Sequence, residues 1–214
     1  MDQAVETVLA EYEARAEREH ANLGPPSPTG DARDARLLEV GRDGALLLNM
    51  IARAMRRPRI LELGTSYGYS TLWLAEAAKA TGGKVISLDL ADYKQAYAAE
   101  ALARAGVAEV VEFRSGDALQ IIPSLEDGFD LVFLDIWKDL YVPCLDLFHP
   151  KLAPGAVIVA DNMLRPSYDR TNALNYRRAV RAKPKITSIL LDVGQGLEIS
   201  RFDGPEEEML QPRE

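Results

Sequence analysis

Apolar and polar residues alternate with two different spacings along the chain, and these spacings predict its helices and strands. Short, mostly apolar runs bounded by glycine, proline or charged residues indicate buried strands. Apolar residues that recur every three or four positions indicate helices with one buried face. The predicted strands are 60–63, 85–89, 110–113, 129–135, 156–161, 186–191 and 197–201. The predicted helices are 2–21, 31–55 (interrupted near 41–44), one that begins at Ser70 or Thr71, 93–105 and 140–152.

The order of these elements predicts the fold class. From Pro58 onward strands and helices alternate, which is typical of a parallel sheet with helices on both faces. The last two strands flank Gly194-Gln195-Gly196, a hairpin signal. We therefore expect an α/β fold with a Rossmann-like, doubly wound sheet that is mostly parallel and ends in an antiparallel C-terminal hairpin strand. We expect one domain over residues 1–214, divided into N-terminal helices (1–56), an α/β core (57–204) and a tail (205–214).

Composition narrows the class of protein. The chain has 214 residues, of which 47% are hydrophobic and 27% charged, as in an ordinary globular domain. Its net charge of −8 argues against a protein that grips nucleic acid through the phosphates. No apolar run approaches a membrane span, no signal peptide is recognisable, and the single Cys144 fits a reducing compartment. We expect a cytoplasmic protein, and with only two histidines a histidine-rich metal site is not available.

The first strand of the core carries the first chemical signal. Glu62 stands inside an apolar run, where a carboxylate is costly to bury unless it is paired or hydrogen-bonded. The turn from Gly64 to Gly68 and the helix start that follows offer close backbone approach and free N–H groups to a ligand. The dinucleotide fingerprint Gly-x-Gly-x-x-Gly is absent, which argues against a pyrophosphate cofactor. An acid followed by Gly-x-x-x-Gly-x-Ser resembles motif I of the class I S-adenosylmethionine-dependent methyltransferases; the alternative is an ordinary strand-to-helix turn with a stray acid.

Four of the predicted strands end in an acidic residue or shortly before one. These residues are Asp89, Asp117, Asp135 and Asp161. In a doubly wound sheet these strand ends line one crevice, where four carboxylates repel one another unless cations or hydroxyls are bound. Asp89 suits a ribose diol because a carboxylate accepts two hydrogen bonds, although dehydrogenases place an acid similarly. For Asp117, ligand binding and capping of the next helix are equally good interpretations.

Two of these acids form a candidate metal site with a neighbouring amide. Asp135, Asp161 and Asn162 supply two carboxylates and an amide carbonyl, which are hard oxygen donors suited to Mg²⁺ or a related cation. Taken alone, Asp161-Asn162 is also a common turn pair after a strand. Lys138 follows Asp135 by three residues and could reach the same pocket as a general base, or it could be a surface lysine paired with Asp135 or Asp139.

The segment Phe133-Leu134-Asp135-Ile136-Trp137-Lys138-Asp139-Leu140-Tyr141, with Val159-Ala160-Asp161-Asn162, is similar to the cation-dependent O-methyltransferases. This family includes the catechol and caffeoyl-coenzyme A O-methyltransferases, and the tryptophan before the lysine resembles the catechol branch. The similarity runs from about Gly44 to Phe202.

The resemblance implies a role for each matching residue. The metal ligands would be Asp135, Asp161 and Asn162. Lys138 would be the catalytic base. The cofactor site would contain Glu62, Gly64, Ser70, Asp89, Asp117, Ala118, Asp135 and Trp137. The substrate site would contain Trp137, Lys138, Asn162 and Asp192. Ser66 departs from the family, which has a tyrosine there, and the match at Asp192 is loose.

The resemblance implies transfer of a methyl group from S-adenosylmethionine to a hydroxyl of a small catechol-like substrate, with Mg²⁺, Mn²⁺ or Ca²⁺ bound. A divalent cation that coordinates both oxygens of a vicinal diol lowers the phenol pKa from about 10. The rings of Trp137 and Tyr141 could flank the substrate ring, or they could pack at the head of a helix.

Two other functions remain open. One is a nicotinamide-dependent oxidoreductase on a similar sheet, and the other is an S-adenosylmethionine-binding protein without turnover. An RNA or protein methyltransferase is disfavoured by the acidic charge balance. We expect a small aromatic diol as partner, no nucleic acid and no membrane, and we favour a homodimer. Substrate specificity would depend on the predicted loop 164–175, whose shape the sequence does not define.

Overall fold

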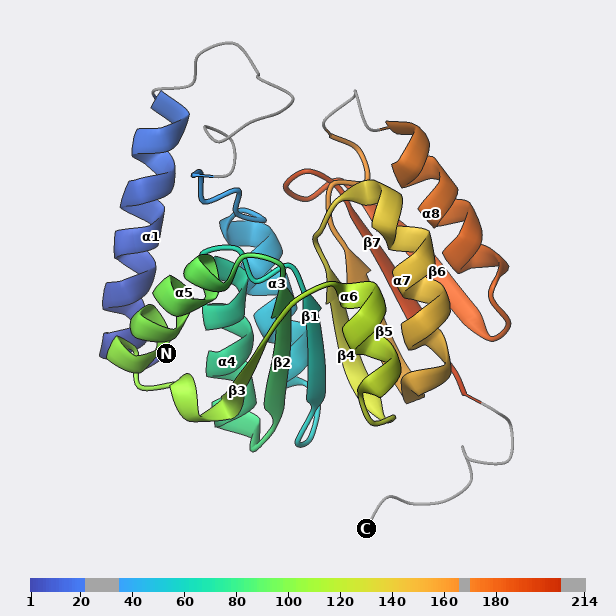
Figure 1. Ribbon diagram of the computed structural model, residues 1–214, viewed down its shortest axis with the longest axis horizontal. Coiled ribbons are helices and arrows are strands. Elements are labelled where there is room, and N and C mark those ends of the chain that lie inside the picture. The colour runs from blue at the N-terminus through green and yellow to red at the C-terminus, as the bar shows by residue number, and fades with distance from the viewer. Residues whose placement is uncertain (22–34, 166–169, 205–214) are drawn as a thin grey trace.

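The computed structural model describes residues 1–21, 35–165 and 170–204. Within these residues one sheet has the strand order β3-β2-β1-β4-β5-β7-β6 (Figure 1). Its strands are β1 (Arg59–Leu63), β2 (Lys84–Asp89), β3 (Val111–Ser115), β4 (Phe129–Leu134), β5 (Leu152–Ala160), β6 (Ile186–Leu191) and β7 (Leu197–Phe202). The first five strands pair in parallel, while β7 is antiparallel to both β5 and β6. The predicted fold class is confirmed.

Helices cover both faces of the sheet (Figure 1). They are α1 (Gln3–Ala21), α3 (Arg42–Arg53), α4 (Tyr69–Thr81), α5 (Asp92–Arg104), α6 (Ala118–Ile121), α7 (Tyr141–Phe148) and α8 (Arg170–Ala182). Short 3₁₀ turns lie at Ala108–Val110, Ile122–Ser124, Lys138–Leu140 and His149–Lys151. Within the described ranges, none of the helices combines the length and the apolar character needed to span a bilayer.

The side-chain alternation of the central strands divides the apolar core in two. Leu131 and Phe133 of β4 pack in one cluster with α1, α3, α4 and α5, whereas Val132 and Leu134 pack in the other with α6, α7 and α8. Successive strand residues point to opposite faces, so a continuous apolar run in β4 fills both clusters. This burial of both faces explains the unbroken apolar run Leu131–Leu134.

Two predicted helices are shorter in the structure. Residues 35–41 are not helical, and α3 begins only at Arg42, because Gly41 before it has a φ of 79° that an α-helix excludes. Residues 31–34 lie outside the described part of the chain. The predicted helix 140–152 ends at Phe148, since Pro150 stands in a 3₁₀ turn and Leu152 already begins β5.

The helix α8 was not predicted, and its first residues replace much of the expected loop 164–175. Its sequence is dominated by arginine and asparagine, which conceals a narrow apolar stripe. Ala173, Tyr176 and Val180 recur at helical spacing and are buried against the sheet. Residues 166–169 of the expected loop lie outside the described residues.

Candidate active site

The carboxyl ends of β1, β4 and β5 meet at one rim of the sheet. Leu134 at the end of β4 is in register with Leu63 of β1 and Ala160 of β5. The pairing continues past the strands, because Asp135 N donates to Leu63 O (2.9 Å) and Asp161 N donates to Leu134 O (3.0 Å). The chain leaves β1 toward α4 on one face and β4 toward α7 on the other, and such a switch point is the usual ligand crevice of this fold.

The turn after β1 packs tightly against the end of β4. Gly64 has a φ of 105°, and a Cβ placed there would lie 2.0 Å from the main-chain oxygen of Asp135. A Cβ at Gly68 would lie 2.5 Å from Cβ of Ala98. Both glycines are therefore required by packing of the protein on itself, a reason that differs from the expected approach to a ligand.

Glu62 is fully buried, and its carboxylate accepts hydrogen bonds from three hydroxyls. Ser70 Oγ and Thr71 Oγ1 donate from the start of α4 (both 2.6 Å), and Ser87 Oγ donates from β2 (2.5 Å). Burial raises the pKa of Glu62 to about 7, and the three hydrogen bonds offset part of that rise. Glu62 thus joins β1, β2 and α4 beneath the predicted cofactor loop.

Two further acids predicted for the cofactor site bind backbone groups. Asp89 accepts from Ser66 N at Oδ2 (2.7 Å) and from Ala91 N at Oδ1 (2.9 Å), which fixes the turn after β1 against the end of β2. Each carboxylate oxygen has a second lone pair, so these bonds leave capacity for a diol. Asp117 caps α6 by accepting from Leu119 N (2.9 Å), and Ala118 is the first residue of that short helix. Of the two interpretations of Asp117, capping is the one observed.

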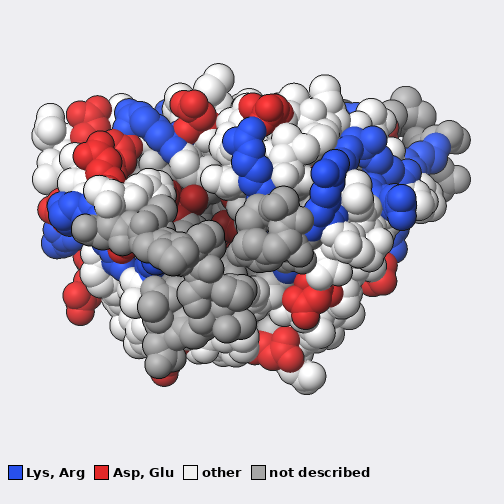
Figure 2. Space-filling model, turned by 90° about the horizontal axis from the view of Figure 1, so that it is seen from above, with Lys and Arg blue, Asp and Glu red and all other residues white. Residues whose placement is uncertain are grey.

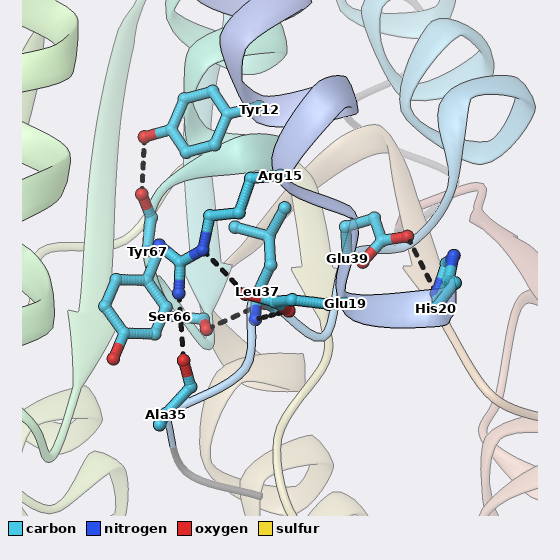
Figure 3. Close-up of polar contacts among 9 residues, drawn as sticks. All are labelled: Tyr12, Arg15, Glu19, His20, Ala35, Leu37, Glu39, Ser66 and Tyr67. Carbon is cyan, nitrogen blue, oxygen red and sulfur yellow. Dashed lines mark hydrogen bonds and ion pairs between the residues drawn. The ribbon is translucent and has the colours of Figure 1, made fainter. Parts of the chain in front are cut away.

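The N-terminal helix α1 also contacts the turn from Gly64 to Gly68. The sequence did not predict this contact. Figure 3 shows Tyr12 donating to the main-chain oxygen of Tyr67 (2.5 Å) and Ser66 donating to that of Leu37 (3.1 Å). The Arg15 guanidinium lies 4.1 Å from the centroid of the Tyr67 ring and donates to Ala35 O (2.9 Å). These contacts join segments that are far apart in sequence, and no motif marks them.

Lys138 lies at the rim beside Asp135. Its side chain is 8% exposed, and Nζ lies 3.6 Å from Asp135 Oδ1. Nζ also donates to Ile136 O (3.0 Å) and to the Tyr141 hydroxyl (2.7 Å). Lys138 is therefore not at the surface, but the pairing with Asp135 that belonged to the alternative interpretation is observed.

Asp161 and Asn162 follow β5 at the same rim. Asp161 is 1% exposed; its Oδ2 accepts from Asn162 Nδ2 (3.1 Å), whereas its Oδ1 is buried and has no hydrogen-bond partner among the described residues. Burial, followed by the negative charge of Asp135, raises the pKa of Asp161 well above its ordinary value. Burial also raises the pKa of Asp135, and the positive charge of Lys138 offsets part of that rise.

These three side chains fit a divalent cation. Asp161 is buried and Asp135 is partly buried, their carboxylates repel each other, and one oxygen of Asp161 has no donor among the described residues. A positive charge placed between them would stabilise this arrangement. Among the described residues no three His, Cys, Asp or Glu side chains form a metal-binding group, and the third oxygen donor here is the amide of Asn162. This donor set suits a hard cation that retains bound water.

The aromatic residues of the rim differ in exposure. Trp137, two residues after Asp135, is 55% exposed. Tyr141 is fully buried and stacks edge-to-face on Tyr176 with centroids 5.3 Å apart. Of the two interpretations of the Tyr141 ring, packing is the one observed, because a buried ring cannot flank a substrate.

The β6–β7 turn also reaches this rim, because Glu198 of β7 is in register with Ala160 of β5. Asp192 in that turn is exposed and forms an ion pair with Arg165 (3.2 Å). Figure 2, which views this end of the molecule, shows acidic atoms in a hollow near the middle of the face and basic side chains gathered on the side of α8.

Comparison with known proteins shows that the chain is similar to methyltransferases. Residues 61–163 match the family described as a methyltransferase domain. The predicted resemblance to the catechol and caffeoyl-coenzyme A O-methyltransferases is confirmed by the relatives of the chain.

Three similar proteins illustrate this relationship. The catechol O-methyltransferase of Mycobacterium tuberculosis is 38% identical over 136 residues, which cover 63% of this chain and 61% of the relative. Caffeoyl-CoA O-methyltransferase 1 of Eucalyptus globulus is 28% identical over 206 residues and 82% of each chain. The structure of the O-methyltransferase TomG of Streptomyces achromogenes, in complex with SAM, is 28% identical with a TM-score of 0.70 and covers 95% of this chain and 91% of TomG. The chain spans about three fifths of the length of the curated catechol O-methyltransferases that it matches.

Proposed function

We propose that the protein is an S-adenosylmethionine-dependent O-methyltransferase that binds a divalent cation and methylates one hydroxyl of a small catechol-like substrate. The observation that carries the proposal is the buried Asp161 Oδ1, which has no donor among the described residues although Asp135 and Asn162 lie at the same rim. The relatives named as catechol and caffeoyl-CoA O-methyltransferases support the reaction class.

Asp135, Asp161 and Asn162 would hold the cation. When bound, the cation would lower the pKa of a vicinal diol and orient both of its oxygens. S-adenosylmethionine, when bound, would supply a methyl group on a positively charged sulfur. A neutral Lys138 amine would take the proton of the reacting hydroxyl at Nζ, and Asp135 beside it would stabilise the ammonium that results.

The remaining residues would act mainly by positioning. The turn from Gly64 to Gly68 is fixed by Asp89 and the Glu62 network, so it offers a rigid surface to the cofactor. The exposed ring of Trp137 would cover the substrate and exclude water from the reacting atoms. Holding two reactants in line can remove much of the barrier to a bimolecular displacement.

A calorimetric titration with S-adenosylmethionine, followed by a methylation assay, tests this proposal. We expect cofactor binding, methylation of catechol in the presence of Mg²⁺, and loss of turnover when a chelator is added. Phenol, with one hydroxyl, is the matched control and should react poorly, because it cannot use two cation-coordinated oxygens. Absence of cofactor binding would overturn the proposal, and full turnover in chelator would remove the cation from it.

A nicotinamide-dependent oxidoreductase remains the rival from another class. The absence of the third glycine after β1 and the methyltransferase relatives count against it. A fluorescence titration with a reduced nicotinamide cofactor separates the two, since only the rival predicts saturable binding. A protein that binds S-adenosylmethionine and methylates none of a panel of catechols would support the non-catalytic alternative.

A further inference from the structure

The hydroxyl of Tyr141 lies between the amine of Lys138 and the main chain of two strand ends. It accepts a hydrogen bond from Lys138 Nζ (2.7 Å). It lies 2.9 Å from Leu134 O, to which it donates, and 3.3 Å from Asp161 O. A phenol has one proton to donate, and the two carbonyl oxygens are the acceptors within reach, so the oxygen of Tyr141 faces Lys138 as an acceptor.

The amine of Lys138 is surrounded by groups of the protein. Ile136 O, the Tyr141 hydroxyl and Asp135 Oδ1 lie at 3.0, 2.7 and 3.6 Å, and the centroid of the Tyr141 ring lies 4.4 Å away. A lysine side chain has about 2 kcal/mol of rotamer entropy, which opposes any single placement of its amine. The contact with Tyr141 is shorter than those with Ile136 O and Asp135 Oδ1 and comes from a fully buried ring, so it restricts that freedom.

We propose that Tyr141 is a positioning residue for Lys138. Its hydroxyl ties the amine to the ends of both β4 and β5, from which Asp135 and Asp161 extend. The amine is thereby held beside Asp135 before any ligand binds. The consequence for catalysis rests on the proposed function, because only then does Lys138 take a proton from the acceptor.

The neighbouring ring supplies a matched control. Tyr176 is also fully buried and packs edge-to-face on Tyr141, yet its hydroxyl has no hydrogen-bond partner within the described part of the chain. Tyr141→Phe and Tyr176→Phe each remove one buried oxygen from the same pair of rings. Only the first substitution removes a contact with Lys138, so the pair separates positioning from packing.

Steady-state kinetics of the two full-length variants with Mg²⁺, S-adenosylmethionine and catechol give the first test. For Tyr141→Phe we expect kcat to fall about tenfold or more, because a small displacement of a catalytic group is costly. We expect the KM for catechol and the Kd for S-adenosylmethionine to change less than about twofold, since the side chain of Tyr141 is fully buried. Tyr176→Phe should retain the wild-type kcat. Equal losses in both variants, or an unchanged kcat in Tyr141→Phe, would overturn the proposal.

A second test needs no ligand and no activity. In a ¹H–¹⁵N spectrum of lysine ammonium groups, the Lys138 signal, assigned by its loss in Lys138→Arg, should be visible because its protons are hydrogen-bonded and shielded from exchange. It should persist in Tyr176→Phe and broaden or vanish in Tyr141→Phe. If Tyr141→Phe does not fold, a nuclear Overhauser contact between the Lys138 ammonium and the Tyr141 ring in the wild type decides, and its absence overturns the proposal. A wild type that does not methylate catechol but shows these signals would refute the proposed function and leave the placement of Lys138 supported.

Discussion

Glu62 and Asp161 are both acidic residues near the carboxyl ends of core strands, and both are almost completely removed from water. Glu62 has three hydroxyl donors around its two oxygens. Asp161 has one amide donor at Oδ2 and no partner at Oδ1 within the described ranges. A buried carboxylate without donors is expensive, so the two residues differ in what they require from outside the protein.

The comparison separates an acid whose two oxygens are fully hydrogen-bonded within the fold from an acid that the proposed function assigns to a cation. The surroundings of Glu62 are complete, and its carboxyl group joins β1, β2 and α4 around the turn from Gly64 to Gly68. The surroundings of Asp161 are incomplete, and the neighbouring Asp135 adds a second negative charge. A positive ion at that place would satisfy the free oxygen and remove the repulsion, whereas no such ion is needed at Glu62.

The largest effect is expected from Asp161→Asn. This change keeps the shape of the side chain and removes the negative charge, so several kcal/mol of cation-dependent stabilisation should be lost. We expect kcat/KM for catechol to fall on the order of a thousandfold. The free energy of unfolding of the cation-free variant should equal or exceed that of the wild type, because a buried, incompletely paired acid has been replaced by a neutral amide.

Steady-state assays and urea unfolding of the same preparation measure both quantities. Asn162→Asp is an informative control, since it keeps three oxygen donors and adds a charge, and we expect it to lower stability without cation. A variant Asp161→Asn that unfolds more easily than the wild type in chelator would contradict the contrast with Glu62.

Glu62→Gln tests the other half of the comparison. Burial raises the pKa of Glu62 from 4.5 to about 7, so the folded protein binds a proton more tightly than the unfolded chain does. This stabilisation is complete below pH 4.5 and is lost as the pH rises to about 7. The loss is about 3 kcal/mol by linkage. Glu62→Gln cannot titrate, so the difference in unfolding free energy between wild type and variant should shift by this amount between pH 4.5 and pH 7.5. A difference that does not depend on pH would show that Glu62 keeps an ordinary pKa in the folded protein.

Cation binding should stabilise the wild type by a smaller amount. At a Mg²⁺ concentration ten times the Kd, mass action predicts about 1.4 kcal/mol. The gain should be absent in Asp161→Asn, because Asp161 belongs to the proposed cation site. It should be retained in Glu62→Gln, because Glu62 does not. Thermal unfolding with Mg²⁺ or chelator at constant ionic strength measures it. An equal gain in all three proteins would place the cation elsewhere.

The strand-end acids were predictable because sequence order alone brings them together. The carboxyl ends of parallel strands lie at one edge of a sheet, so Asp135 and Asp161 become neighbours once β4 and β5 are adjacent. Glu62 was recognisable as an unusual acid for a different reason, namely a charge inside an apolar run. Its three hydroxyl partners come from β2 and α4, and that choice depends on side-chain geometry that no spacing records.

Other parts of the site depend on long-range packing that the sequence pattern does not reveal. Tyr12 reaches a main-chain oxygen 55 positions away, and this contact follows from the packing of α1 against α4 and α5. The helix α8 was missed because its arginines dominate its composition. Two of them, Arg177 and Arg181, pair with the buried Glu198 of β7, so these charges help to attach the helix to the sheet.

The smallest effect is expected when the hydrogen bond from α1 to the turn between Gly64 and Gly68 is removed. Tyr12→Phe removes the donor to Tyr67 O and leaves the aromatic contacts of the ring, so about 1 kcal/mol of stability should be lost. Because Tyr67 lies inside the turn from Gly64 to Gly68, the affinity for S-adenosylmethionine should fall by about fivefold if all of that energy holds the turn in its binding conformation. Calorimetry measures this affinity, and Tyr176→Phe, which removes a buried hydroxyl without a partner in the described residues, should leave it unchanged. Equal affinities in Tyr12→Phe and wild type, with the loss of stability intact, would mean that α1 supports the fold alone and that Glu62 and Asp89 suffice to shape the turn.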